Sequence, residues 1–204
     1  MNRSLVVHKR FTQNPLGRDW VCGDLHGQYD VLMTAQDNAG FDPNIDRLFL
    51  LGDLIDRGPQ SAELLSWVLE ADRVHSVIGN HELMFIGGAT RPGYREKHRQ
   101  IGGQWADQLN FSRYRLLTTG CANLLSLTIP IETESGSLGL VHAQSPVDDW
   151  RELATMGFTP TRSPSIAPGH RARAGGREHN RRCVRAHWHP GHRSTGKPGL
   201  DRHA

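Results

Sequence analysis

Long apolar runs and paired cysteines are both missing from this sequence of 204 residues. No run reaches the roughly 18 apolar residues that a membrane span needs, and the apolar stretch within Met1–Arg10 is too short for a signal peptide. Cys22, Cys121 and Cys183 lie far apart and form no Cys-x-x-Cys pair, which argues against a disulfide framework and a thiolate zinc site. These absences predict a cytoplasmic protein with free thiols and no membrane partner.

Branched aliphatic residues are scarce in the last part of the chain. Residues 159–204 contain only Ile166, Val184 and Leu200 of this kind and carry a net charge of +8, whereas residues 1–158 carry −5. Because so little apolar surface cannot offset the entropy of ordering, the sequence predicts one domain over 1–158 and a mostly disordered basic tail over 159–204. Apart from Trp188 the tail lacks aromatics that would stack on bases, so nucleic acid is not an expected partner.

Three apolar runs in the first domain each end at a glycine that is followed by polar residues. They are Trp20–Cys22, Leu48–Leu51 and Val74–Ile78. Helical patterns follow them at residues 29–36, from Pro59 onward and at 83–86. Strand, loop and helix in series predict an α/β fold with a parallel sheet whose loops share one edge, where such sheets bind ligands.

The rest of the domain is less regular. Residues 91–110 are polar and contain the distinctive Ile101-Gly102-Gly103-Gln104-Trp105, and we expect a helical insertion over the site there. Leu124–Ile129 and Leu138–Val141 have strand composition, and a further helix is expected to begin near Asp149, Trp150 and Leu153.

Candidate metal ligands occupy the ends of the expected strands. They are Asp24, His26, Asp53, Asn80 and His142. Carboxylate, amide and imidazole ligands without thiolate suit Mn, Fe or Zn. A carboxylate shared between two ligand sets suits a two-metal centre, in which ions about 3.5–4 Å apart clamp a phosphoryl group and acidify a bound water, which makes hydroxide available.

Three further residues in the same loops suit phosphoryl chemistry. Arg57 could hold phosphate oxygens bidentately. His81 could protonate a leaving alkoxide as a general acid, oriented by the carboxylate of Asp56.

The motifs Gly23-Asp24-Leu25-His26-Gly27, Gly52-Asp53-Leu54-Ile55-Asp56-Arg57-Gly58 and Gly79-Asn80-His81-Glu82 resemble the signatures of the calcineurin-like metallophosphoesterases. The resemblance is greatest to the serine/threonine protein phosphatases of the bacterial and bacteriophage-lambda type. It implies a four-layer αββα sandwich and hydrolysis of phosphoserine or phosphothreonine esters by metal-bound hydroxide. By resemblance two divalent ions, with Mn preferred, are held by Asp24, His26 and Asp53 and by Asp53, Asn80 and His142, which makes Asp53 the bridge.

The symmetrical diadenosine tetraphosphate hydrolases share the first motif and are an alternative, acting on a small phosphoester instead of a phosphorylated protein. These relatives typically carry Ala-Arg where this chain has Asp56-Arg57, and Asp where it has Glu82. Both differences favour the protein phosphatase.

The resemblance ends before the C-terminus. The family's second phosphate-binding arginine and its Gly-His-Thr motif are not recognisable here, and residues 186–194 show no strand pattern to hold His187, His189 or His192 as the missing metal ligand. Tail composition suggests a change of reading frame between Met156 and Ile166, which would leave the sandwich incomplete at its C-terminal end. An inactive remnant or a basic-tailed binding protein is therefore a second alternative.

Several of these residues could also have a purely structural role. Asp56-Arg57 could be a surface ion pair, and His142 could be a core histidine. We expect His75, His98 and His179 to be solvated, and Trp67 and Trp105 to be core residues.

Overall fold

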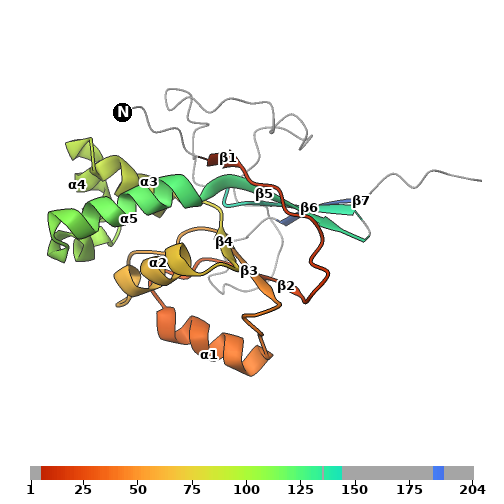
Figure 1. Ribbon diagram of the computed structural model, residues 1–204. Coiled ribbons are helices and arrows are strands. Elements are labelled where there is room, and N and C mark those ends of the chain that lie inside the picture. The colour runs from red at the N-terminus through yellow and green to blue at the C-terminus, as the bar shows by residue number, and fades with distance from the viewer. Residues whose placement is uncertain (1–5, 135, 144–185, 191–204) are drawn as a thin grey trace, which may run out of the picture.

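Two β-sheets lie face to face in the computed structural model, which describes residues 6–134, 136–143 and 186–190 (Figure 1). The strands are β1 (Val6–His8), β2 (Asp19–Cys22), β3 (Arg47–Leu50), β4 (Val74–Ser76), β5 (Ser126–Thr133), β6 (Gly136–Val141) and β7 (Ala186–Pro190). The helices are α1 (Tyr29–Ala39), α2 (Ser61–Glu70), α3 (Asn80–Gly88), α4 (Pro92–Gln100) and α5 (Phe111–Leu124), with a 3-10 helix η1 (Gly103–Gln108).

The first sheet is parallel, with strand order β2-β3-β4. In its register Leu50 lies between Cys22 and Ser76, so the three strands end at the same edge. The prediction of three strand, loop and helix units sharing one edge is therefore confirmed. Gly40 has φ 68° and caps α1 in the left-handed region.

The alternation of side chains along β3 builds a core on each face of this sheet. Leu48 and Leu50 face α1 and α2, where Leu64 and Leu65 are fully buried. Phe49 and its neighbours face the second sheet, in which the order is β1-β5-β6-β7 and which contributes the buried residues Ile129, Ile131 and Leu140. Helices, first sheet and second sheet form successive layers of an α/β structure (Figure 1).

The chain segment that connects β4 of the first sheet to β5 of the second is helical. Helices α3, α4 and α5 gather at one end of the molecule (Figure 1). The expected insertion at 91–110 is present as α4 and η1, but α5 was not predicted from the sequence. The signal was available, because Asn110 caps α5 by accepting a hydrogen bond from the Arg113 N–H, and Tyr114, Leu117 and Cys121 recur on one buried face.

The expectation that residues 186–194 form no strand is wrong for Ala186–Pro190. This segment is β7, which pairs antiparallel with β6. The backbone hydrogen bonds of a sheet edge can recruit a segment of low apolar content. The helix expected near Asp149 lies outside the described residues, and the described helices include none long and apolar enough to cross a membrane.

Candidate metal centre

The loops that leave the first sheet hold unusual backbone conformations. His26, Asp53, Asp56 and Arg57 have φ values of 46°, 49°, 74° and 68°, and they are the non-glycine residues with positive φ in the described part of the chain. Such conformations cost free energy and persist where the surrounding structure imposes them, as at functional sites. All four belong to the loops that carry the predicted site.

Two glycines allow these loops to approach one another. A Cβ on Gly58 would lie 2.0 Å from the carbonyl oxygen of His26, and one on Gly79 would lie 2.3 Å from the amide nitrogen of Asp53. The motif glycines therefore bring three chain segments into contact that any larger residue would separate.

Asp53 lies at the centre of the resulting cluster and is fully buried. Asp24, Asp53 and His142 place ligand atoms within 4.8 Å of one another, as do His26, Asp53 and His81. The structure thus brings together the carboxylates and imidazoles that the sequence analysis selected. The assignment of each ligand to one of two ions stays a prediction.

The imidazole of His142 is oriented by the backbone. Its Nδ1 lies 2.7 Å from the carbonyl oxygen of Leu51, which can only accept, so Nδ1 carries the proton. Nε2 then faces Asn80 Oδ1 at 3.2 Å and Asp53 Oδ1 at 3.3 Å. An imidazole nitrogen and two oxygens that converge in this way are the ligand types that a hard or borderline metal ion takes, so these residues fit such an ion.

His26 is oriented in the same way. Its Nδ1 lies 3.1 Å from the carbonyl oxygen of Ile55, which leaves Nε2 to face the centre 4.0 Å from Asp24 Oδ2. Burial lowers the pKa of His26. The hydrogen bond to the Ile55 carbonyl raises this pKa, but the nearby charges of Arg57 and His81 lower it, and the net shift is downward. The imidazole is therefore neutral near pH 7, which is the form that binds metals.

Arg57 lies at the exposed side of the cluster. Its guanidinium is 2.8 Å from His26 Nε2, and its backbone N–H is 3.4 Å from the carbonyl oxygen of Gly102. The alternative prediction that Asp56 and Arg57 form a surface ion pair is wrong, because Asp56 is fully buried and its carboxylate accepts hydrogen bonds from other residues. An exposed guanidinium beside a metal site suits contact with a phosphate.

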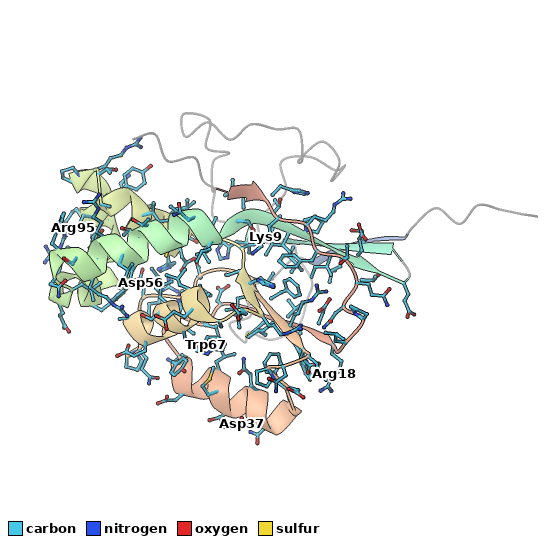
Figure 2. All side chains as sticks on the ribbon, in the orientation of Figure 1. Lys9, Arg18, Asp37, Asp56, Trp67 and Arg95 are labelled. Carbon is cyan, nitrogen blue, oxygen red and sulfur yellow. The ribbon has the colours of Figure 1, made fainter. Side chains whose placement is uncertain are left out.

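His81 and Asp56 form a buried pair. Asp56 Oδ2 accepts from His81 Nδ1 at 2.7 Å, and His81 Nε2 faces Asp53 Oδ2 at 3.9 Å. Burial by itself raises the pKa of Asp56, but hydrogen bonds from His81, His98 and Trp105 outweigh it, and the pKa lies below its ordinary value. Figure 2 shows Asp56 on the side of the molecule that carries α3, α4 and α5.

One residue near Asp56 was misjudged from the sequence, and a second has a contact that was not predicted. His98, expected to be solvated, is only 1% exposed and its Nε2 donates to Asp56 Oδ1 at 2.8 Å. Trp105 packs against the core as expected, but its indole N–H also donates to Asp56 Oδ1 at 2.7 Å. The adjacent Gly102-Gly103 was the available signal, since paired glycines mark a close approach of backbone.

Three other residues were expected to be solvated or to belong to the core. His75 is not solvated, because its ring packs 4.3 Å from Phe11 and 5.4 Å from Phe49 between centroids. Trp67 is a core residue in contact with Tyr29, as predicted. His179 lies outside the described residues.

Glu82 holds the loops of the candidate site together, a role that was not predicted from the sequence. Its buried carboxylate accepts from the backbone N–H groups of Asp53 at 3.0 Å, Leu54 at 2.9 Å, Ile55 at 3.3 Å and Gly79 at 2.8 Å. It therefore binds the second and third motifs to each other. The contact with Gly79 follows the capping-box spacing, in which a glutamate three residues after the N-cap accepts from the N-cap N–H. The other three partners are backbone groups of another loop, and no spacing rule reveals them.

Strand β7 contains His187 and His189, two of the residues considered as a replacement for the family's last metal-binding histidine. Its register places His187 opposite Gly139 and His189 opposite Ser137. These positions precede His142 by three and five residues on β6, or about 10 and 17 Å at 3.3–3.4 Å per residue. The strand thus carries both histidines away from the metal edge, and His192 lies outside the described residues.

The comparison with protein families gives one clear match. A family model described as calcineurin-like phosphoesterase matches residues 18–198. The match begins just before the first motif and continues through β7, within the segment 159–204 that was expected to be a basic tail.

Individual relatives match part of their length. Serine/threonine-protein phosphatase 2 of Escherichia coli K12 is 41% identical over 93 residues, which cover 46% of this chain and 42% of that protein. Its Salmonella typhimurium counterpart is 34% identical over 139 residues, covering 64% and 60%. The symmetrical bis(5'-nucleosyl)-tetraphosphatase of Baumannia cicadellinicola is 48% identical over 65 residues, covering 31% and 23%. The chain therefore spans less than two thirds of these relatives.

A solved structure supports the fold. A protein serine/threonine phosphatase from Saccharomyces cerevisiae aligns with a TM-score of 0.55 and 18% identity, covering 80% of this chain and 51% of that one. At this identity the likeness concerns the fold alone.

Proposed function

The chain belongs to the calcineurin-like phosphoesterase family, and from this premise we propose that it is a metal-dependent phosphatase that hydrolyses phosphoserine and phosphothreonine esters. The products are the free hydroxyl side chain and inorganic phosphate. The substrate would be a phosphorylated protein, and the cytoplasm is the compartment that the sequence analysis predicts.

The observation that carries this proposal is the buried pair of Asp56 and His81. A serine or threonine ester has an alkoxide leaving group, which is a strong base and departs readily only when it receives a proton. His81 Nδ1 is held at 2.7 Å by Asp56, so Nε2 is the atom that would donate this proton on the side of Asp53. After the transfer, solvent returns the proton to His81.

The metal site would be completed by two divalent ions, proposed to be manganese. Asp24, His26, Asp53, Asn80 and His142 would hold them, with Asp53 as the shared ligand. When bound, such ions supply a clamp for the phosphoryl oxygens and an acidified water as nucleophile. Arg57 would add a bidentate contact to the phosphoryl group from the exposed side, which orients the ester toward His81.

The relatives named serine/threonine-protein phosphatase 2 support the proposed substrate class, because their alignments include the longest of the three described above. A second candidate is symmetrical hydrolysis of diadenosine tetraphosphate, favoured by relatives of that name at 48% identity over a shorter stretch. There the leaving group is a nucleotide phosphate, an acidic group that departs without a proton. The Asp56 and His81 pair therefore favours the protein phosphatase.

The test compares both substrates on the full chain in the presence of Mn²⁺. A phosphothreonine peptide and diadenosine tetraphosphate are supplied to the wild type and to His81→Asn. We expect the wild type to hydrolyse the peptide faster, and His81→Asn to lose about 100-fold or more on the peptide. Faster hydrolysis of the dinucleotide would favour the second candidate, and hydrolysis of neither would contradict both.

A further inference from the structure

The carboxylate of Asp56 receives donors from three different elements. Oδ2 accepts from His81 on α3, while Oδ1 accepts from His98 on α4 at 2.8 Å and from Trp105 on η1 at 2.7 Å. Ser61 adds a contact at the backbone, because its hydroxyl oxygen accepts from the Asp56 N–H at 2.9 Å. Asp56 is thus fixed at both carboxylate oxygens and at its amide.

We propose that His98 and Trp105 are positioning residues for the acid His81, acting through Asp56. This inference rests on the proposed function, in which His81 protonates the leaving group. A carboxylate held only by His81 could rotate about its terminal bonds and carry the imidazole with it. Two donors on the opposite oxygen fix the carboxylate plane, and thereby the direction of His81 Nε2.

The two donors are themselves held rigidly. The ring of Phe85 lies 5.5 Å from that of His98 and 5.3 Å from that of Trp105 between centroids. A Cβ on Gly103 would lie 2.4 Å from the His98 ring, so the glycine leaves the room that the imidazole occupies. The unusual segment from His98 to Trp105 therefore has a consistent explanation, since it brings two N–H groups to one carboxylate oxygen.

Charge supports the same role. Asp56 is fully buried, and in the described part of the chain the side chains that hydrogen-bond to it are those of Ser61, His81, His98 and Trp105 rather than those of arginine or lysine. A buried carboxylate stays ionised only when donors replace its lost hydration, and the N–H groups of His98 and Trp105 are such donors. The ionised form is the one that accepts from His81 Nδ1 and stabilises the protonated imidazole. Removing a donor should therefore impair proton donation by His81 more than it destabilises the fold.

The dependence of rate on the leaving group distinguishes positioning from a merely structural role. Phenyl phosphate needs a proton on its leaving oxygen, whereas 2,4-dinitrophenyl phosphate releases a stable anion that needs none. In the full chain with Mn²⁺, we expect His98→Leu and Trp105→Phe to lower kcat for phenyl phosphate about 10- to 100-fold and kcat for the dinitrophenyl ester less than about 3-fold. His98→Gln keeps an N–H donor and should recover most of the loss.

Two controls sharpen the result. Lys97→Ala changes the exposed neighbour of His98 on α4 and should leave both rates unchanged. In a His81→Asn background, which lacks the acid, His98→Leu should have no further effect on phenyl phosphate, because residues in one network are not additive. Equal losses on both esters, or a full additional loss in the His81→Asn background, would overturn the proposal.

A measurement without catalysis separates this inference from the proposed function. The hydrogen-bonded Nδ1 proton of His81 should give a far-downfield NMR signal in the metal-free full chain, and it should broaden or move upfield in His98→Leu and return in His98→Gln. An unchanged signal in His98→Leu would overturn the positioning role. A wild type that hydrolyses no phosphoester but shows these changes would contradict only the proposed function.

Discussion

Replacement of Glu82 by glutamine tests how the metal loops are held together. Each carboxylate oxygen of Glu82 accepts two backbone N–H groups, Oε1 from Leu54 and Ile55, and Oε2 from Asp53 and Gly79. Glutamine keeps the shape but has one oxygen and one NH₂ group. One pair of backbone donors would then face another donor and lose its acceptor inside the protein.

The expected cost follows from the number of bonds lost. A hydrogen bond to a charged group contributes about 1.5–3 kcal/mol, and a buried group without a partner costs about 1–3 kcal/mol. Two lost bonds therefore predict that Glu82→Gln lowers the free energy of unfolding by about 3–5 kcal/mol. For a chain of this size the melting temperature should fall by roughly 2–4 °C per kcal/mol, or about 10 °C in all.

Urea denaturation followed by circular dichroism measures this change. The matched control is Glu63→Gln, which alters an exposed acidic residue in the first turn of α2 and should change stability by less than about 0.5 kcal/mol. If Glu82→Gln proves as stable as the control, the four backbone bonds do not hold the loops, and the account of Glu82 is refuted.

Three other changes have definite expected outcomes. Gly79→Ala should lower the unfolding free energy by about 1–3 kcal/mol, because its Cβ would lie 2.3 Å from Asp53 N, while Gly93→Ala, with open space around it, should cost nothing in urea denaturation. Burial, together with the charges of Lys9 and Arg47, lowers the pKa of His75 to about 4. Below pH 6.5 the unfolded state therefore binds a proton that the native state does not. As a result, His75 progressively lowers the free energy of unfolding as the pH falls from 6.5 to about 4. The stability difference between wild type and His75→Gln should follow that window, and a flat difference would contradict it. His142→Ala should weaken Mn²⁺ binding about 10- to 100-fold or more by calorimetric titration, and unchanged affinity would remove His142 from the ligand set.

Much of the first sheet and its site could be predicted because the signals are local. Runs such as Leu48–Leu51 that stop at glycine locate the strand ends, and parallel strands place those ends at one edge. Asp24, Asp53 and His81 follow such strands, and the structure places the ligand atoms of Asp24 and His81 close to Asp53.

The residues that were missed act through contacts that leave no sequence pattern. Glu82 bonds to backbone N–H groups of another loop, and His98 reaches Asp56 from a helix 42 residues away along the chain. Composition alone also misjudged Ala186–Pro190, where pairing with β6 rather than apolar content forms the strand. Tertiary contacts decide such positions, and local propensity does not contain them.

Asp53 is proposed as the common ligand of a two-metal phosphoesterase site, because it belongs to both groups of converging ligand atoms. The direct test is Mn²⁺-dependent hydrolysis of 4-nitrophenyl phosphate by the full chain, compared with Asp53→Asn, which keeps the size of the side chain and removes its charge. We expect a loss of more than about 100-fold, since the substitution weakens both metal positions at once. Equal rates in the two proteins, both dependent on Mn²⁺, would contradict the claim.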